Sequence, residues 1–331
     1  MNRSLPISLA MRIEQWPIAG SFTISRGAKT QAAVVVAELS DGHHRGRGEC
    51  VPYARYGETV DGVAETISAL ASEITRGLDR GALQQAMRPG AARNAIDCAF
   101  WDLAAKRTGK PVHVLAGLPA PKPLVTAYTI SLAEPDVMAE QAAKAAGRAL
   151  LKIKLGSADD RARIMAVRRA APNAELIVDA NEGWTPANLA DNLAACAQAG
   201  VTLVEQPLTA DADDALSHIA RPLPVCADES VHARASLPGL VGKYDAVNIK
   251  LDKTGGLTEA LAMVKDAERL GFAVMAGCMV ATSLAIAPAI LIGQRARLVD
   301  LDGALLLASD RPDGLRYEES LVHPATPTLW G

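Results

Sequence analysis

From position 123 onward the chain alternates short apolar runs with amphipathic stretches. The apolar runs predict eight strands, at 124–130, 151–155, 175–179, 201–205, 223–228, 245–250, 272–276 and 297–301. Between them, apolar residues recur at three- and four-residue spacing and predict helices, among them 159–171, 187–199 and 257–270. A strand and a helix repeated about every two dozen residues indicate parallel βα units. Eight such strands are enough to close a barrel.

The first part of the chain has a different pattern. Alternation and turn signals predict strands at 7–19, at 31–39 and from Gly46 to Cys50, the last two joined by a turn at Asp41-Gly42. Loops are predicted at 22–27 and 52–58, and helices at 60–76 and 91–107. Antiparallel strands followed by helices indicate an α+β unit that precedes the barrel.

The composition excludes several classes of protein. A net charge of -3 over 331 residues argues against a nucleic-acid partner. The five cysteines are scattered and form no Cys-x-x-Cys pair, which favours reduced thiols in the cytoplasm. Arg12 ends the first apolar run, and Gly277 and Pro288 break the longest late one, so we predict neither a signal peptide nor a membrane span. The apolar stretch 260–264 leaves open whether a homo-oligomer interface or ordinary core lies there.

Two lysines share one face of the predicted strand 151–155. Because alternate side chains of an extended chain point to the same side, Lys152 and Lys154 face together and the apolar residues face away. Neighbouring ammonium groups repel and lower each other's pKa. A lysine that is neutral near pH 7 can act as a general base. The alternative is an edge strand that lysines protect from pairing.

Three acidic residues end three successive strands of the predicted barrel. Asp179, Glu205 and Asp228 close the third, fourth and fifth strands. The carboxyl ends of barrel strands meet at one rim, and three close carboxylates stay ionised together only beside a cation. Oxygen ligands favour Mg²⁺ or Mn²⁺. The alternative is that each acid caps a helix, which explains one such residue better than three in a row.

A third lysine ends the sixth predicted strand. Lys250 lies four strands from Lys154 in a ring of eight, so the two lysines are expected to face each other across the barrel mouth. A substrate carboxylate held by a metal ion between them would present its α-carbon to an amine on each side. One lysine could remove a proton from that carbon and the other could return one to its opposite face.

Taken together, the Lys-x-Lys strand, the Asp-x-Asn, Glu-Gln-Pro and Asp-Glu-Ser strand ends and the Asn-Ile-Lys strand resemble the muconate-lactonising subgroup of the enolase superfamily. The resemblance extends over nearly the whole chain. It implies an α/β fold with a modified TIM (β/α)7β-type barrel at 118–310. It also implies an N-terminal α+β capping domain at 1–117 and a C-terminal tail at 311–331 that returns to the cap.

The same resemblance implies roles for single residues. Lys154 and Lys250 would be the acid/base pair, and Lys152 would bind the substrate carboxylate and lower the pKa of Lys154. The implied ligands of Mg²⁺, with Mn²⁺ as the other option, are Asp179, Glu205 and Asp228. Asn181 and Glu229 would support these ligands. All six histidines fall outside the strand ends and are expected to be structural or exposed.

The end of the eighth strand points to the substrate. By alternation Asp300 and Asp302 share a face in the barrel mouth, where two unpaired carboxylates would attract a substrate ammonium; the alternative is that they cap a helix or bind solvent. This pair resembles the feature by which dipeptide epimerases hold the ammonium of an N-terminal residue. The resemblance implies that Arg26, with Arg55 in reserve, meets a second carboxylate. Thr129 and Cys278 would be further substrate contacts.

The resemblance to dipeptide epimerases implies an isomerase that inverts the glutamate α-carbon of an acidic dipeptide, L-Ala-D/L-Glu, derived from murein. Two alternatives stay open at this point. The first is a cycloisomerase or o-succinylbenzoate synthase of the same subgroup, because the metal site alone does not choose the reaction. The second is a non-catalytic barrel that binds a small molecule.

Overall fold

Eight parallel strands form the central sheet. The computed structural model describes residues 6–156 and 158–331. The strands lie side by side in chain order: β5 (Tyr128–Ile130), β6 (Leu150–Lys154), β7 (Glu175–Asp179), β8 (Val201–Glu205), β9 (Val225–Ala227), β10 (Ala246–Ile249), β11 (Ala273–Gly277) and β12 (Leu298–Asp300). The backbone N–H of Ala127, just before β5, donates to the carbonyl of Val299 at 2.8 Å. The first and last strands therefore meet, as the predicted barrel requires.

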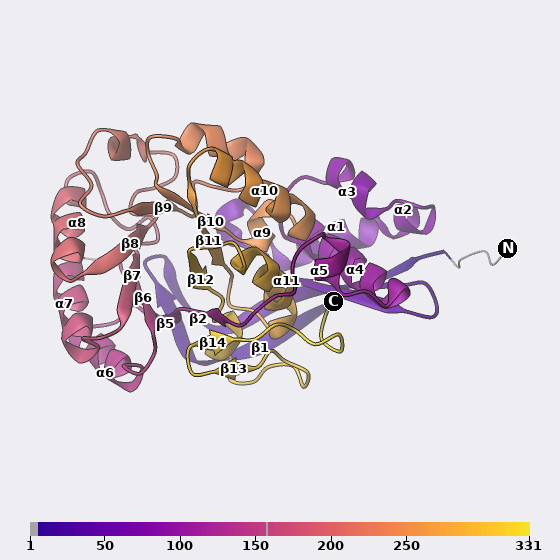
Figure 1. Ribbon diagram of the computed structural model, residues 1–331, viewed down its shortest axis with the longest axis horizontal. Helices are drawn as coiled ribbons and strands as arrows, with labels where there is room; N and C mark the ends of the chain where they lie inside the picture. Colours follow the sequence, from indigo (N-terminus) through magenta and orange to yellow (C-terminus); the bar gives the residue numbers. More distant parts are fainter. Residues whose placement is uncertain (1–5, 157) are drawn as a thin grey trace.

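Helices cover the outside of this sheet (Figure 1). They are α6 (Pro135–Lys144), α7 (Asp160–Ala170), α8 (Leu189–Gln198), α9 (Leu251–Thr254), α10 (Leu257–Arg269) and α11 (Ser283–Gly293). The connections after β8 and β9 carry short 3-10 helices instead, η2 (Asp214–Ser217) and η3 (Arg234–Leu240). A further 3-10 turn, η4 (Gly303–Leu306), follows β12. Seven connections join eight strands, which confirms the predicted modified barrel.

The alternation of β6 decides which side chains reach the barrel interior. Leu151 and Ile153 pack in the large core between the sheet and its helices. Leu150 instead joins a smaller apolar layer inside the barrel, together with Ile177 and Leu203. Because the side-chain period of a strand is two, Lys152 and Lys154 share the inward face of Leu150 and stand above that layer. The apolar floor thus directs both lysines toward the mouth.

The N-terminal part of the chain forms an antiparallel sheet with helices on one side. Its strands are β1 (Ser8–Ile24), β2 (Gly27–Ser40) and β3 (Arg45–Cys50). Its helical segments are η1 (Ala54–Tyr56), α1 (Val60–Ala69), α2 (Ala71–Thr75), α3 (Arg80–Ala86), α4 (Ala91–Thr108) and α5 (Val112–Leu115). A side chain at Gly46 or Gly48 of β3 would collide with the backbone of α4, so these glycines let the helix lie directly on the strand.

Three predicted boundaries are wrong. The segment 22–27, expected as a loop, is the tip of a long hairpin, because β1 and β2 continue their pairing to Ile24 and Gly27. The predicted helix 60–76 is two helices that break at Leu70. The predicted strand 124–130 is also two: β4 (Leu124–Val125) leaves the barrel sheet, and only β5 belongs to it. Of the three, the split of 124–130 reflects a pairing partner distant in the sequence, because β4 pairs with β14.

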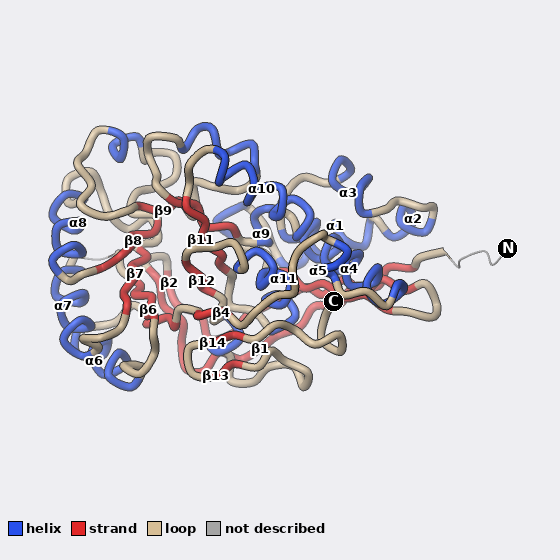
Figure 2. The backbone as a smooth tube through the Cα atoms, in the orientation of Figure 1, coloured by secondary structure: helices blue, strands red, loops and turns tan. Residues whose placement is uncertain are grey.

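The C-terminal segment contacts both parts of the molecule. Its strand β14 (Leu321–Val322) pairs with β13 (Tyr317–Glu318) on one side and with β4 on the other, in a small sheet next to the barrel in Figure 2. The Trp330 indole N–H donates to the Cys98 carbonyl of α4 at 3.0 Å. Arg311 bridges Glu49 at 2.6 Å and Glu14 at 2.7 Å. No strong local pattern of apolar and polar positions predicts strands in this segment, since the partners that order it lie in the cap and in β4.

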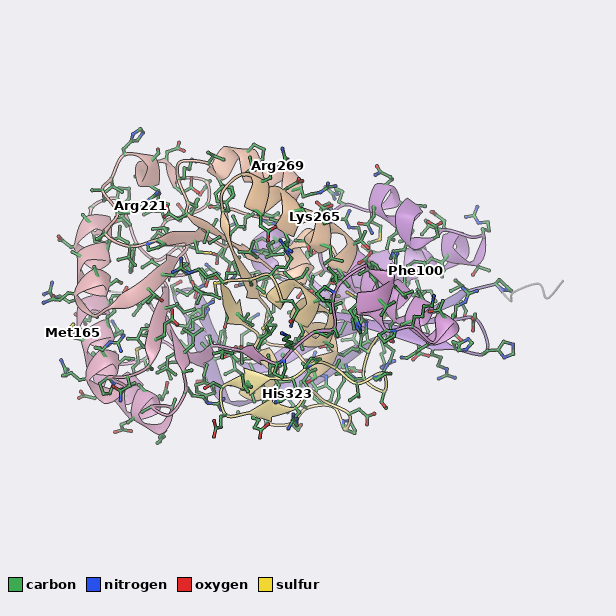
Figure 3. The ribbon with its side chains drawn as sticks, viewed as in Figure 1. Phe100, Met165, Arg221, Lys265, Arg269 and His323 are labelled. Atoms are coloured by element: carbon green, nitrogen blue, oxygen red, sulfur yellow. The ribbon has the colours of Figure 1, made fainter. Side chains whose placement is uncertain are left out.

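The apolar stretch 260–264 lies in α10. Ala260, Met263 and Val264 of α10 are buried in the core, whereas Lys265 and Arg269 lie on its outer side (Figure 3). Three of the five residues in the stretch 260–264 are therefore core, whereas Leu261 and Ala262 are partly exposed. Within the described residues, no helix combines the length and the apolar character that crossing a membrane demands.

Candidate active site

A cavity of about 680 Å³ lies between the cap and the barrel mouth. The tip of the β1–β2 hairpin and the segment 51–56 supply its cap side, and the strand ends supply its barrel side. Its lining includes most of the predicted site residues, namely Arg26, Thr129, Lys152, Lys154, Asn181, Asp228, Glu229, Lys250, Cys278, Asp300 and Asp302. Asp179 and Glu205 are completely buried next to them. The fold thus gathers residues that are nearly 280 positions apart in the sequence into one chamber.

The three acids at the ends of β7, β8 and β9 form one cluster. Carboxylate oxygens of Asp179, Glu205 and Asp228 all lie within 4.8 Å of one another. Directly after two of these acids the chain turns through the left-handed region, at Asn181 (φ 45°) and Gln206 (φ 35°). Such conformations cost free energy in residues other than glycine and recur at functional sites. The strand ends are therefore bent sharply just where the carboxylates converge.

The cluster fits a divalent cation. Burial and the Asp179 carboxylate raise the pKa of Glu205 to about 7. Burial raises the pKa of Asp179 and Asp228 as well, but the neighbouring lysines outweigh it and hold both pKa values below the usual value, so Glu205 is the acid of the cluster whose ionised form lacks compensation. Hard oxygen donors of this kind are the ligands that Mg²⁺ and Mn²⁺ prefer. Asp179, Glu205 and Asp228 would hold the ion, each from a different strand.

The two predicted acid/base lysines each contact a different acid of the cluster. Lys154 Nζ lies 2.7 Å from Asp179 Oδ2. Lys250 Nζ lies 2.6 Å from Asp228 Oδ2. Because β6 and β10 are four places apart in an eight-stranded ring, the lysines approach the cluster from opposite walls. A substrate atom between the walls would be within reach of both.

The expectation that neighbouring lysines lower each other's pKa is wrong for Lys152. Its ammonium lies 2.7 Å from both Asp300 and Glu205 and 3.1 Å from Asp179. Burial lowers the pKa of Lys152, but these three carboxylates outweigh it and hold the pKa well above the usual value. The same balance, with Asp228 and Glu205 as the nearby acids, raises the pKa of Lys250. Carboxylates, rather than the other lysines, dominate the field in the mouth.

Asp300 and Asp302 lie in the cavity as predicted, but they are not unpaired. Asp300 Oδ2 accepts from Lys152 at 2.7 Å, and Asp302 Oδ2 accepts the backbone N–H of Thr129 at the same distance. Burial and the Asp300 carboxylate raise the pKa of Asp302 to about 7. The second oxygen of Asp300 is buried without a hydrogen-bond partner among the described residues. This leaves an acceptor available to a ligand at the β12 end of the cavity.

The two arginines of the cap are both engaged by carboxylates of the barrel. Arg26 at the hairpin tip contacts Glu229 at 2.6 Å and the carbonyl of Asn181 at 2.8 Å. Arg55 binds Glu182 through two hydrogen bonds of 2.7 Å. Sequence reasoning missed Glu182. Its only signal is its place three residues after Asp179, in a turn whose φ of 63° is as unusual as that of Asn181.

Two aromatic residues of the cap were also missed. Phe22 lies over Lys154, with 5.6 Å between the ammonium and the ring centroid. Tyr56 lines the cavity on the other side and packs edge-on against His232, with ring centroids 4.5 Å apart. The nearby Asp228 and, above all, burial raise the pKa of Tyr56. No local pattern could find these residues, since their role depends on how the cap docks.

The remaining predicted residues take supporting places. Thr129 is buried on β5 and reaches Asp302 through its backbone. Cys278 follows β11 and lines the cavity. Burial and the nearby acids raise the pKa of its thiol well above the usual value, so it is not an activated nucleophile. Figure 3 places His323 beside β13 and β14, in the C-terminal segment.

The fold and the acid cluster define an enolase-type barrel, and family models match both of its parts. A model described as mandelate racemase/muconate lactonizing enzyme, N-terminal domain, matches residues 6–117, and one described as enolase C-terminal domain-like matches residues 137–326. The chain belongs to the mandelate racemase/muconate lactonizing enzyme family of the enolase superfamily.

Particular relatives narrow the comparison. The chain is 45% identical over 312 residues to the L-Ala-D/L-Glu epimerase of Escherichia coli (strain K12), covering 94% of this chain and 97% of that protein. It is 42% identical over 303 residues to the N-acetyl-D-glutamate racemase of Pseudoalteromonas sp, covering 90% and 95%.

A solved structure is more similar still. It is an enolase family member from Agrobacterium tumefaciens with homology to dipeptide epimerases, with bound sodium and L-Ala-L-Glu. It matches with a TM-score of 0.97 and 57% identity, and covers 98% of this chain and 100% of that one. Because the relatives are epimerases and racemases, they confirm the prediction of an isomerase.

Proposed function

We propose that the protein inverts the α-carbon of glutamate in L-Ala-D/L-Glu dipeptides by transfer of a proton between two lysines. The observation that carries this proposal is the placement of Lys154 and Lys250. They stand on strands four apart in a ring of eight, line one cavity and flank the same acid cluster. The similarity to the Escherichia coli epimerase supports the same reaction.

Asp179, Glu205 and Asp228 would hold Mg²⁺, the cofactor that we propose, with Mn²⁺ as a substitute. When bound, the ion would supply positive charge that stabilises the substrate carboxylate as the α-proton leaves and that offsets the upward effect of the acids on the pKa of Lys250. The substrate carboxylate would then lie at the cluster, where Lys152, which lines the cavity, supplies a further positive charge.

The two lysines then perform the inversion. In one direction Lys154, as the neutral amine, would take the α-proton from one face of the carbon, and Lys250, as the ammonium, would return a proton to the other face; the reverse direction exchanges these roles. The Nζ atoms of Lys154 and Lys250 lie 2.7 and 2.6 Å from Asp179 and Asp228, so each lysine is held against the cluster. General acid–base catalysis of this kind contributes roughly 10²- to 10⁴-fold in rate.

Opposite charges at the two ends of the cavity would bind the two charged ends of the substrate. Asp300 and Asp302 at the β12 end would receive the ammonium of the N-terminal residue. Arg26 and Arg55 at the cap end would receive the side-chain carboxylate of glutamate, in competition with Glu229 and Glu182. The proposed setting is the recycling of murein peptides in the cytoplasm, which the five free cysteines support.

A ¹H NMR screen in D₂O tests this function. With Mg²⁺ present, the glutamate α-proton of L-Ala-L-Glu and L-Ala-D-Glu should exchange for deuterium with inversion, and EDTA should stop it. N-acetyl-D-glutamate, the compound for which the Pseudoalteromonas relative is named, has no ammonium and should react at least about tenfold more slowly. Faster reaction of the N-acetyl compound would overturn the substrate assignment. If none of the acidic dipeptides exchanged its α-proton, the proposed reaction would be overturned.

A further inference from the structure

One buried lysine in the barrel mouth has no place in the reaction described above. Lys253 lies in the short helix α9, three residues after Lys250, and its side chain is completely buried. Its ammonium lies 2.5 Å from Asp228 Oδ1 and 2.6 Å from the Asp228 carbonyl. The Asn248 carbonyl is 2.9 Å away. The three N–H donors of an ammonium therefore meet three acceptors, two of them from one residue.

Packing alone does not explain this lysine. Taking an ammonium out of water is costly unless it is fully hydrogen-bonded, and an apolar side chain of similar volume fills such a space without that cost. Lys253 is not among the described residues that line the cavity, so it does not reach the substrate. Its contacts single out Asp228 as the group that it serves.

Lys253 makes the two walls of the mouth different. Asp228 lies between two ammonium groups, because its Oδ1 faces Lys253 and its Oδ2 faces Lys250. Asp179 on the opposite wall also contacts two lysines, Lys154 and Lys152, but both lie at Oδ2, whereas Oδ1 accepts the backbone N–H of Asn181 at 2.9 Å. The Oδ1 atom of Asp228 therefore meets a positive charge, and the Oδ1 atom of Asp179 meets a neutral donor.

We propose that Lys253 is a positioning residue for Asp228 and, through it, for Lys250. By occupying Oδ1 and the carbonyl, it fixes the rotation of the carboxylate, so that Oδ2 alone faces Lys250 and the proposed cation. This inference rests on the proposed two-lysine reaction. Without Lys253, Asp228 can rotate, and both the cation and the ammonium of Lys250 lose a fixed partner, whereas Lys154 keeps its own.

The test compares Lys253→Met with Lys253→Arg, which keeps the charge. A matched control is Lys106→Met, which removes a lysine paired at 2.7 Å with the buried Asp102 in the cap. Two quantities are measured. One is the exchange of the α-proton of each epimer in D₂O before inversion, with Lys250→Ala to assign which epimer faces Lys250. The other is the affinity of the metal-free protein for Mn²⁺ by isothermal titration calorimetry.

Lys253→Met should slow exchange on the Lys250 face at least tenfold and on the Lys154 face by less than about threefold. It should also weaken Mn²⁺ binding about five- to tenfold, with a small change in KM. Lys253→Arg should shift both quantities in the same direction by less, and Lys106→Met should shift neither. Equal slowing of both faces, or unchanged Mn²⁺ affinity in a folded variant, would overturn the proposal.

The design separates this proposal from the function on which it rests. Thermal melting and circular dichroism report whether each variant is folded. If Lys253→Met is not folded, Lys253→Arg is compared with the unaltered protein instead. If the unaltered protein exchanges no dipeptide, the proposed function fails. The Mn²⁺ titration then still decides whether Lys253 positions Asp228.

Discussion

The two walls of the barrel mouth carry the same chemical group in different surroundings. On one wall Lys154 contacts Asp179, and the Phe22 ring of the cap lies 5.6 Å from its ammonium. On the other wall Lys250 contacts Asp228, which is held from behind by Lys253. Both lysines come from equivalent ends of parallel strands, so the barrel makes their positions alike. The loops and the cap supply different neighbours to the two lysines, so their surroundings differ.

This difference shows that the strands of the barrel set where the two lysines lie, whereas the loops and the cap set the surroundings of each lysine. A proton transfer between two faces needs an amine on each side of the carbon, and strand geometry meets that need. One amine lies against an aromatic ring, and the acid that the other amine contacts has a second ammonium at its other oxygen. The two half-reactions therefore run in distinct fields, although the overall equilibrium between the epimers belongs to the substrates alone.

The largest effect should come from removing either lysine. Lys154→Ala and Lys250→Ala should each lower the rate of inversion by at least about 10³-fold, because each removes one partner of the transfer. Each variant should still exchange the α-proton of one epimer, and a different one in each case. ¹H NMR in D₂O measures both quantities. If both variants kept exchange of the same epimer, the lysines would not serve opposite faces.

An intermediate effect, equal on both walls, should come from β12. Asp302→Asn should lower kcat/KM for L-Ala-L-Glu and L-Ala-D-Glu alike, by roughly 10- to 150-fold, since a lost charge-assisted hydrogen bond costs about 1.5–3 kcal/mol. This variant keeps the contact between Lys152 and Asp300. N-acetylglutamate, which has no ammonium, is the control and should change less than about threefold. If kcat/KM fell for one epimer only, Asp302 would act together with one of the two lysines rather than on the substrate ammonium that both epimers share.

The smallest effect is a dependence of kcat/KM on pH that should be the same for both epimers. Because burial and Asp300 raise the pKa of Asp302 to about 7, this carboxyl is neutral below that pH and negatively charged above it. Binding of the substrate ammonium requires the charged form. We therefore expect kcat/KM for dipeptides to fall by up to about tenfold per unit as pH drops below 7. A pH–rate profile checks this, and Asp302→Asn should flatten that limb; an unchanged profile in the variant would contradict it.

The sequence by itself determined the barrel and the positions of its reactive groups. Strands at 175–179 and 201–205 were predicted with the bounds that the structure has. Parallel strands pair in a fixed register and end at one rim, so an acid or lysine at a strand end needs no further information to reach the mouth. Local pattern was sufficient wherever the partner was the next strand.

Only the tertiary structure decided what these groups contact. The pairing of Arg55 with Glu182 joins residues 127 positions apart, and the pairing of Asp300 with Lys152 joins residues 148 positions apart. The same holds for the split of 124–130 between two sheets and for the place of Phe22 over Lys154. The reason is physical: the charge and cover that a side chain meets depend on segments brought together only when the cap docks on the barrel, and no local period encodes that contact.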